Sequence, residues 1–464
     1  MNAPLPPAVR DLLEALPPEV VLTPERFAGR ARNFWDASPL EAAALLRPRS
    51  TAEVSQILAI CHRRAQSVVT QGGRTGVCDG DRASATDVVL SLEAMNRIEE
   101  IDPVGRTVCV QAGCVLQVLQ EAVAARDLFL PLDLGARGSC TIGGNVSTNA
   151  GGINVIRHGM TRALVLGLEV VLADGTVLSS LNRMLKNNSG YDLKQLFIGS
   201  EGTLGVVTRV VLALKEKPSS SLSALLAVAE GPQVLALLKR MDRGLGGALS
   251  SFEVMWGDYY RAVTRPGAHV APLAREHPFY VVLEMQGANE TADAARFEST
   301  LAEAFEQGLV ADAVLAHSLK DRDRLWAVRE DFSSILQFKP QFLYDISVPL
   351  RHMLEYVEAV RARLLARWPE CLFYVLGHIG DGNLHFFVCP QCEGEGQHAA
   401  ADEAVYGPLA AIGGAVSAEH GIGLEKKHWL QSSRTPPEID AMRRLKRAFD
   451  PQNILNPGKV FDLE

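Results

Sequence analysis

Two glycine-rich segments limit most strongly what this chain can fold into. The first is QGGRTG, residues 71–76, directly after the run SVVT, and the second is GSCTIGGNVSTNAGG, residues 138–152. Glycine lets a backbone turn sharply and approach a phosphate closely, although each segment alone is also typical of tight turns. Neither segment matches the GxGxxG that opens a Rossmann helix, and the chain has no GxxxxGK[ST]. An NAD-binding Rossmann site and a P-loop therefore lose their main support.

Length and composition indicate a globular protein with two domains. A chain of 464 residues exceeds one ordinary core, and its 47% hydrophobic and 22% charged residues are ordinary fractions. The net charge of −8 argues against a nucleic-acid partner, because phosphate binding depends on clustered Lys and Arg. No stretch approaches the roughly 20 consecutive apolar residues of a membrane span, and the N-terminus lacks the apolar run of a secretory signal.

Cysteine usage favours a reducing compartment. Eight cysteines in this length are too sparse for a disulfide scaffold, so we expect a cytoplasmic protein, with peripheral association with the inner membrane left open. Cys389 and Cys392 have the spacing of a metal clip or redox pair. Because no second CxxC accompanies them, an ordinary loop is the favoured interpretation.

Hydrophobic periodicity predicts alternating strands and helices in the first half of the chain. Strands are expected at 67–70, 87–92 and 107–111, with a hairpin turning at Asp174–Gly175. The first predicted helix buries one face, made of Val54, Ile57, Leu58 and Cys61. The second buries another, made of Val115, Val118, Leu119, Ala122 and Val123.

The polar stretch KEKPSSSLS, which begins at Lys215, is the best candidate for a linker. After it, strands such as FYVVLEM mix with helices such as RFESTLAEAFEQGL, which is typical of an α+β domain. A last helix, IDAMRRLKRAFD, is expected to end before Pro451. Its predicted buried face consists of Ile439, Met442, Leu445 and Phe449.

The order of the motifs resembles the vanillyl-alcohol-oxidase superfamily of FAD-linked enzymes. QGGRTG is followed by PLDLGARGSCTIGGNVSTNAGG and GYDLKQLFIGSEGTLGVVT, and then by GHIGDGNLH, SAEHGIGLEKK and FDPQNILNPGK. The resemblance runs from about Leu46 to the C-terminus. It is strongest to the branch of D-2-hydroxyglutarate dehydrogenase, D-lactate dehydrogenase and the glycolate oxidase flavin subunit.

This resemblance implies an α+β architecture with a two-subdomain FAD-binding domain and a substrate domain. The substrate domain would have an antiparallel sheet flanked by helices. The implied bounds are 1–216 for the FAD-binding part, 217–425 for the substrate and metal domain, and 426–464 for a segment that returns to the FAD domain.

The resemblance also implies which residues surround FAD. Some relatives tether FAD through a His in the first glycine loop, and because this loop has none we expect non-covalent FAD. Asp133 and Thr148, each taken alone, would equally suit turn or capping positions. The implied residues are Gln71, Gly72, Gly73, Arg74, Thr75, Gly76, Pro131, Asp133, Thr141, Gly144, Asn145, Thr148, Gly151, Glu201, Gly202, Val207 and Asn456.

The segment CLFYVLGHIGDGNLHFFV predicts two strands joined at HIGDG. His378 ends the first strand, and Asn383 and His385, two residues apart, face the same side of the second. Two imidazoles and the carboxylate of Glu419 would suit zinc or manganese with open positions for substrate. The spacing alone fits a structural histidine pair as well. The resemblance implies that His378, His385 and Glu419 are metal ligands.

Alcohol oxidation explains why these residue types are needed. A metal on the hydroxyl oxygen lowers the hydroxyl pKa, and a base with a near-neutral pKa, typically His, takes the proton. The resemblance implies that His420 is this base and that Asn383 contributes to the substrate site. Asp381, in GDG, is more simply a turn residue.

Three further positions bear on the substrate. Arg329 resembles a clamp for the substrate carboxylate, since a guanidinium can bind a carboxylate bidentately, but it also fits a surface helix charge paired with an acid. Ser333 stands where hydroxyglutarate enzymes carry Thr. Leu343 stands where they carry Lys, and Lys339 lies four residues earlier. Monocarboxylic substrates therefore stay open.

The sequence thus predicts FAD-dependent, metal-assisted dehydrogenation of a D-2-hydroxy acid by hydride transfer to flavin N5. D-2-hydroxyglutarate and D-lactate-like acids are the expected substrates. A homodimer is expected, with electron-transfer flavoprotein, a quinone or a cytochrome as acceptor. The alternatives are an FAD oxidase of another substrate, which the metal set argues against, and the flavin subunit of an electron-transfer complex.

Overall fold

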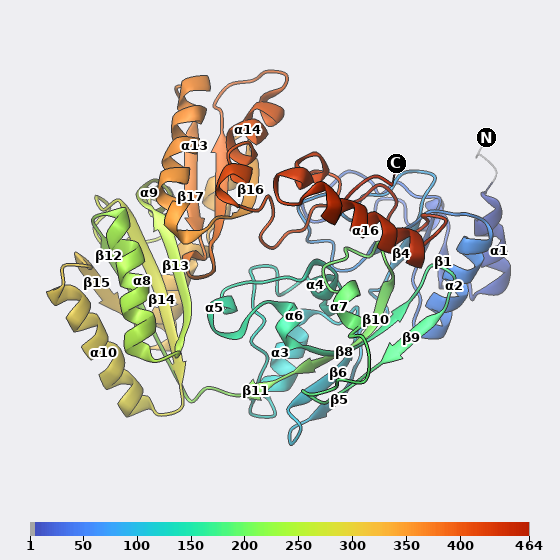
Figure 1. Cartoon of the computed structure of the whole chain (residues 1–464), viewed down its shortest axis with the longest axis horizontal. Coiled ribbons are helices and arrows are strands. Elements are labelled where there is room, and N and C mark those ends of the chain that lie inside the picture. Colours follow the sequence, from blue (N-terminus) through green and yellow to red (C-terminus); the bar gives the residue numbers. More distant parts are fainter. Residues whose placement is uncertain (1–4, 464) are drawn as a thin grey trace. The chain divides into compact units, whose positions relative to one another are not determined.

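The computed structural model describes residues 5–463, which form two compact units (Figure 1). The first unit is built from three segments: one that ends at Gly151, one that spans Met160–Lys217 and one that begins at Glu419. The second unit comprises Gly152–Gly159 and Pro218–Ala418. The main segment of the second unit therefore begins inside the polar stretch KEKPSSSLS.

One layer of the first unit is a four-stranded sheet in the order β1 (Val21–Leu22), β2 (Ala44–Leu46), β4 (Val88–Ser91) and β3 (Val68–Gln71). β2, β4 and β3 run parallel, and β1 pairs antiparallel with β2. Helix α2 (Thr51–Arg63) begins after Ser50, whose hydroxyl accepts the amide of Glu53. The four apolar residues predicted for its inner face are all buried, which confirms that prediction.

The other layer is a five-stranded antiparallel sheet. Its order is β5 (Ile98–Asp102), β6 (Thr107–Gln111), β10 (Val206–Ala213), β8 (Val165–Val171) and β9 (Val177–Ser180). The β8–β9 hairpin turns at Asp174–Gly175, as predicted. A short pair, β7 (Leu128–Phe129) with β11 (Lys215–Glu216), lies outside it.

The predicted inner face of the second helix is partly wrong. Helix α3 (Leu116–Ala124) buries Leu116, Leu119 and Val123, whereas Val118 is 52% exposed. Positions 116, 119 and 123 repeat at helical spacing, and this stripe excludes 118. The apolar pattern alone did not indicate which of two overlapping stripes packs inward.

The last helix differs from its prediction in the same way. In α16 (Pro436–Phe449), Leu445 is 37% exposed and Lys446 is only 3% exposed. The Lys446 ammonium donates to Asp450 Oδ2 at 2.5 Å, to the Thr203 carbonyl at 2.8 Å and to the Leu455 carbonyl at 2.7 Å. These three acceptors make the buried lysine the inward residue in place of Leu445.

The chain after α16 returns to the parallel sheet. The Val68 amide donates to the Ile454 carbonyl at 2.7 Å, and the Asn456 amide donates to the Val68 carbonyl at 2.9 Å. This tail therefore extends the pairing at β3. It brings Asn456 to the end of the strand that leads into the first glycine loop.

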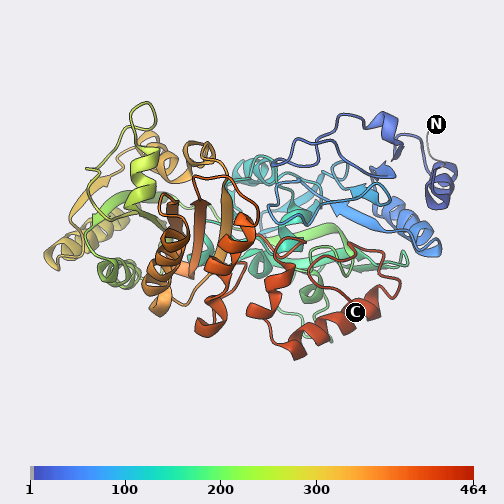
Figure 2. The ribbon, with the colours of Figure 1, turned by 90° about the horizontal axis from the view of Figure 1, so that it is seen from above.

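The second unit is organised around a seven-stranded antiparallel sheet flanked by helices, which confirms the predicted α+β class. Helices α8 (Gly231–Leu245) and α10 (Glu290–Glu306) lie side by side (Figures 1 and 2), and α13 (Met353–Arg367) contacts α14 (Gln397–Tyr406). The strand order is β15 (Asp312–Leu315), β12 (Ser220–Val228), β14 (Phe279–Gly287), β13 (Leu249–Trp256), β17 (Leu372–Gly377), β18 (Asn383–Cys389) and β16 (Phe342–Ser347).

Within residues 5–463, no helix is long and apolar enough to cross a membrane. All eight cysteines are free, and seven of them are buried. Cys389 ends β18, whereas Cys392 is exposed in the following loop, and neither belongs to a candidate metal group among the described residues.

Candidate active site

The two glycine-rich segments meet in the first unit. A Cβ atom on Gly72 would lie 2.6 Å from Thr141 Oγ1, and one on Gly73 would lie 2.2 Å from the Ser139 carbonyl oxygen. Only glycine permits this approach, since real Cβ contacts are longer. Arg74, at φ +58°, donates from Nη1 to the Ala31 carbonyl at 2.7 Å. The two glycine-rich segments, which lie about sixty residues apart in the sequence, thus pack directly against each other.

Several buried polar atoms around this contact have no hydrogen-bond partner among the described residues. They lie at the ends of β3 and β4, in the loop after β3 and at the start of the second glycine segment. Buried polar groups in proteins are nearly always hydrogen-bonded, so this concentration fits a polar ligand such as FAD. The atoms are Thr70 Oγ1, Gln71 Oε1, Asp81 Oδ2, Ser91 Oγ and Thr141 Oγ1.

Other residues implied for FAD binding serve the local structure of the first unit. Thr141 precedes α4 (Ile142–Thr148), and Thr148 Oγ1 donates to the Gly144 carbonyl at 3.1 Å. Asp133 accepts from Arg137 Nη1 at 2.7 Å. Val207 is buried in β10 opposite Val170. Five further residues implied for FAD binding also lie in the first unit, namely Thr75, Gly76, Pro131, Asn145 and Gly151.

Asn456 connects three parts of this unit. Its Oδ1 accepts the Thr70 amide at 2.9 Å, and its Nδ2 donates to the Glu201 carbonyl at 2.6 Å. A Cβ atom on Gly202, at φ +70°, would lie 2.9 Å from Asn456 Nδ2. The C-terminal tail therefore joins β3 to the 201–202 turn, as the order of motifs implied.

The Glu201 carboxylate holds the loop that carries His420. Its two oxygens accept the amides of Ile422 and Gly423, both at 2.8 Å. Burial raises the pKa of Glu201, and these two amides oppose the shift. A Cβ atom on Gly421, at φ +84°, would lie 2.9 Å from Glu201 Oε1. The close approach explains why glycine stands there.

Cys78 supports the same loop from the first glycine-rich region. Its Sγ donates to the His420 carbonyl at 3.1 Å, and its own carbonyl accepts the Leu424 amide at 3.0 Å. A Cβ atom on Gly423 would lie 2.0 Å from that carbonyl oxygen. Sequence reasoning missed this role of Cys78, because nothing local marks a cysteine as the partner of a loop more than 300 residues away.

In the second unit, His378 and His385 lie next to each other. His378 follows β17 and His385 lies in β18, and their ring centroids are 5.2 Å apart at an interplanar angle of 85°. Ligand nitrogens of the two rings lie within 4.8 Å of each other. The hairpin joined at HIGDG is as predicted.

Asp345 of β16 contacts both polar residues that were predicted on one face of β18, Asn383 and His385. It is fully buried opposite His385 and accepts Asn383 Nδ2 at 2.8 Å, and its Oδ1 lies 3.7 Å from His385 Nδ1. Asn383 and His385 therefore face the same side, as predicted. The role of Asp345 was not predicted, although Asp345 follows Leu343 by two residues in LYDISVP and therefore shares a strand face with it.

Asp345 also marks where the chain leaves the second unit. Its Oδ2 accepts the amide of Ala418 at 3.2 Å, and Ala418 is the last residue of that unit. Glu419 and His420 are the next two residues along the chain. The residue directly before the predicted ligand and base, Ala418, is thus held by Asp345, the carboxylate that also lies beside His385.

Arg329 is not a surface charge. It is 3% exposed in α11 (Leu319–Glu330), its Nε donates to Glu253 Oε2 at 3.0 Å, and its Nη2 forms an ion pair with the same oxygen at 2.9 Å. The other oxygen of Glu253 lies 2.6 Å from His378 Nδ1. Although burial raises the pKa of Glu253, attraction by His378 and Arg329 outweighs it and holds the pKa below its usual value. Sequence reasoning missed Glu253.

Two positions considered for the substrate are placed differently. Ser333 is exposed at the start of α12 (Ser333–Leu336), and its hydroxyl donates to Asp331 Oδ1 at 2.6 Å. Leu343, in β16, packs against an apolar cluster that includes Trp326 and Phe387. The position where relatives carry Lys is thus part of an apolar surface.

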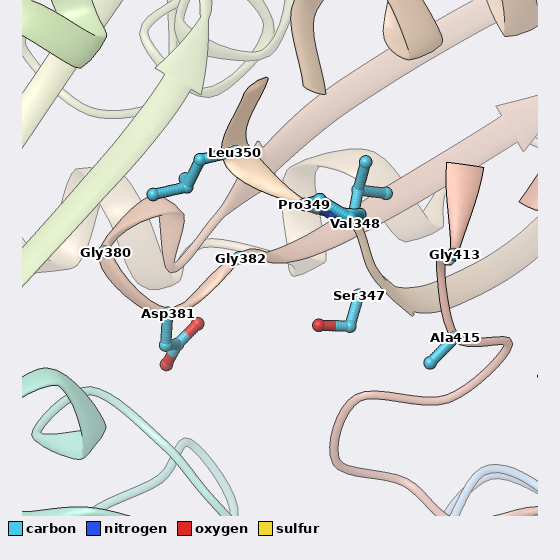
Figure 3. Close-up of a pocket in the computed structure, with 9 residues that line it drawn as sticks. All are labelled: Ser347, Val348, Pro349, Leu350, Gly380, Asp381, Gly382, Gly413 and Ala415. Carbon is cyan, nitrogen blue, oxygen red and sulfur yellow. The ribbon is translucent and has the colours of Figure 1, made fainter. Parts of the chain in front are cut away.

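A cavity of about 350 Å³ opens beside the HIGDG turn (Figure 3). It is lined by Ser347, Val348, Pro349, Leu350, Asp381 and Ala415, with three glycines. Asp381 also accepts the Asn383 amide at 3.1 Å within the turn, as predicted for a turn residue. Burial raises the pKa of Asp381 to about 6, partly offset by His378. Among its lining residues Asp381 is the only ionisable one.

Comparison with known families agrees with this arrangement. Residues 42–180 match the model of an FAD binding domain, and residues 217–460 match that of the FAD linked oxidases, C-terminal domain. FAD is therefore the cofactor that the first unit is built to bind.

Curated relatives cover most of the chain. It is 41% identical to the mitochondrial D-2-hydroxyglutarate dehydrogenase of Bos taurus, over 97% of this chain and 82% of that protein. It is 40% identical to the D-2-hydroxyglutarate dehydrogenase of Xanthomonas citri, over 92% and 90%. A putative mitochondrial D-lactate dehydrogenase of Schizosaccharomyces pombe is 35% identical, over 89% and 81%.

Solved structures share the fold at low identity. A 4-ethylphenol oxidase from Gulosibacter chungangensis is 19% identical with a TM-score of 0.75, and p-cresol methylhydroxylase is 14% identical with a TM-score of 0.75. Each match covers 98% of this chain and 96% of the other. The chain therefore belongs to the FAD-linked oxidases, in the group that contains the D-2-hydroxyglutarate dehydrogenases.

Proposed function

We propose that this protein oxidises a D-2-hydroxy acid to the 2-oxo acid, with FAD as the hydride acceptor at N5. The observation that carries the proposal is the histidine pair of the second unit, in which a buried carboxylate orients His378 beside His385. The names of relatives about 40% identical over most of the chain support the same reaction.

We assign a divalent metal, zinc or manganese, to His378, His385 and Glu419. A carboxylate such as Glu253 only accepts, so the hydrogen on His378 lies on Nδ1 and Nε2 carries the lone pair that a metal needs. A metal bound there would lower the pKa of the substrate hydroxyl. The assignment of Glu419 rests on its place directly after Ala418, because the Ala418 amide donates to Asp345, which lies beside His385.

The remaining roles fall to side chains of this chain. His420 would take the hydroxyl proton, and the hold of Glu201 and Cys78 on its loop would limit where the imidazole can move. Asn383 would contact the substrate from β18. Nε of Arg329 donates to Glu253 and Nη2 lies 2.9 Å from the same oxygen, so Nη1 is the nitrogen that we assign to the substrate carboxylate. Ser333 would contribute only if it left Asp331.

The substrate is expected to include monocarboxylic acids. Leu343 packs into an apolar cluster where hydroxyglutarate enzymes carry Lys, so no cation at this position attracts a second carboxylate. D-lactate or bulkier apolar D-2-hydroxy acids should therefore compete well with D-2-hydroxyglutarate. The acceptor, electron-transfer flavoprotein or a quinone, and a homodimeric assembly remain proposals that depend on the family.

A panel of D- and L-2-hydroxy acids assayed by dye reduction tests this function. D-acids should reduce the dye and L-acids should not, with oxygen consumption far slower than dye reduction. Fast oxygen consumption would favour the oxidase alternative. Absence of turnover with every acid would favour a flavin subunit of a larger complex. A thousandfold preference for D-2-hydroxyglutarate over all monocarboxylates would refute the argument from Leu343.

Metal removal tests the metal assignment separately. Chelation should abolish turnover while leaving the flavin spectrum nearly intact, because two of the three assigned ligands, His378 and His385, lie in the second unit, whereas the FAD-binding residues lie in the first. Added zinc or manganese should restore activity. Full activity in protein that elemental analysis shows to be metal-free would refute the metal site.

A further inference from the structure

We propose that Glu253 is a positioning residue that sets the imidazole of His378 and the guanidinium of Arg329 at once. The inference rests on the proposed function and extends it, since it names the residue that prepares both the metal ligand and the carboxylate clamp. It assigns a function to a buried acid that no sequence motif marks.

Glu253 lies in the middle of the sheet, on β13 between β14 and β17. Its side chain is 1% exposed, and each carboxylate oxygen has a separate partner. Oε1 lies 2.6 Å from His378 Nδ1, while Oε2 accepts from Arg329 Nε at 3.0 Å and lies 2.9 Å from Arg329 Nη2 in an ion pair. One carboxylate thus fixes two side chains from two other elements.

A stability role alone explains this arrangement poorly. The strand neighbours Phe252 and Val254 are buried, and a buried ion pair is often no more stabilising than apolar residues of similar volume. A carboxylate does what an apolar residue cannot: it selects the tautomer in which His378 Nε2 can coordinate. Outer partners of this kind typically change metal affinity by about 10- to 100-fold.

Glutamine at this position cannot satisfy both partners. If its oxygen accepted from His378, its amide group would point its hydrogens at the guanidinium of Arg329. If its amide group faced His378 instead, Nδ1 would have to accept and the hydrogen would move to Nε2. The first arrangement disturbs the clamp, and the second removes the lone pair that binds the metal.

The same sheet supplies a matched control. Glu284 on the adjacent strand β14 is also 1% exposed, and it accepts from Arg322 Nε at 2.6 Å. Arg322 belongs to the same helix as Arg329, and Glu284 also accepts from Ser223, Trp326 and Gln286. Glu284 contacts no histidine in any described interaction. Glu284→Gln therefore removes a buried charge of the same kind without touching His378.

The experiment compares Glu253→Gln, Glu253→Asp and Glu284→Gln as FAD-loaded full-length proteins. Zinc affinity is measured by competition with a chromophoric chelator, together with FAD content, thermal unfolding and KM for a turned-over acid. We expect Glu253→Gln to bind zinc about 10- to 100-fold more weakly and to raise KM, with FAD content unchanged. Glu284→Gln should keep wild-type zinc affinity, and Glu253→Asp should recover part of it.

The outcomes separate this inference from the proposed function. A wild-type protein that binds no zinc or manganese stoichiometrically overturns the metal assignment itself. A wild-type protein that binds zinc, with equal affinity in Glu253→Gln, overturns the role of Glu253 alone. Equal losses in Glu253→Gln and Glu284→Gln overturn it too, because they would show a general effect of removing a buried charge. If Glu253→Gln does not fold, Glu253→Asp with wild-type zinc affinity and KM overturns it.

Discussion

Replacing Lys446 with Met removes a buried ammonium from the contact between α16 and the rest of the first unit. Three acceptors would lose their donor: the Asp450 carboxylate and the carbonyls of Thr203 and Leu455. Breaking a buried ion pair by removing one partner typically costs about 3–5 kcal/mol. Burial lowers the pKa of Lys446 although Asp450 opposes the shift, so desolvation already offsets part of the attraction. We therefore expect the low end, about 3 kcal/mol.

A loss of this size should be plain in thermal unfolding. For a domain of this size about 1 kcal/mol shifts Tm by about 2–4 °C, so Lys446→Met should lower the Tm of the first unit by about 6–12 °C. Release of flavin fluorescence on heating would report this unit specifically. FAD affinity should weaken as well, because the displaced tail carries Asn456.

The neighbouring residue is the control. Leu445→Ala changes an apolar residue that the sequence pattern placed inside but that is 37% exposed, so it should cost less than about 1 kcal/mol. If Leu445→Ala lowers Tm more than Lys446→Met, the packing of α16 described above is wrong. If both leave Tm unchanged, the Lys446 contacts contribute nothing to stability.

The remaining predictions concern the cofactor, the base and pH. Heat or acid should release FAD into the supernatant, because the QGGRTG loop has no His to tether it, and flavin that precipitates with the chain would contradict non-covalent binding. His420→Asn should slow flavin reduction in stopped flow by about 100- to 10,000-fold, with FAD and metal content unchanged, and a near wild-type rate would place the base elsewhere. Burial lowers the pKa of Lys459 to about 8, against the attraction of Asp87 and Asp81. Between about pH 8 and 10 the unfolded state then binds more protons than the folded state, so the unfolding free energy should rise with pH relative to Lys459→Met. Parallel pH profiles of wild type and variant would refute the lowered pKa.

Local patterns predicted much of the fold because they report local geometry. The inner face of α2, the β8–β9 hairpin and the pair of strands around HIGDG depend on a period of 3.6 or 2 residues and on turn residues. The same reasoning misplaced Val118 and Leu445, because two overlapping apolar stripes on a helix look alike until a neighbouring element selects one.

The candidate site also has a part that local motifs predicted and a part that only the folded chain shows. The residue types for FAD and metal binding stand in continuous motifs, so the order of QGGRTG, GHIGDGNLH and SAEHGIG was enough to propose them. That the glycine loops touch each other, with no room for a Cβ atom at Gly72 or Gly73, became clear only from the packed chain.

What the sequence by itself determined is therefore the set of chemical groups and the elements that carry them. The tertiary structure decided which charges are buried together: Glu253 with Arg329 and His378, Asp345 beside His385, and Lys446 with Asp450. Glu253 and His378 are 125 positions apart, and no periodicity links them. Burial makes such a charge tolerable only when a partner arrives from another element, so its place follows from the folded neighbours and not from the local pattern.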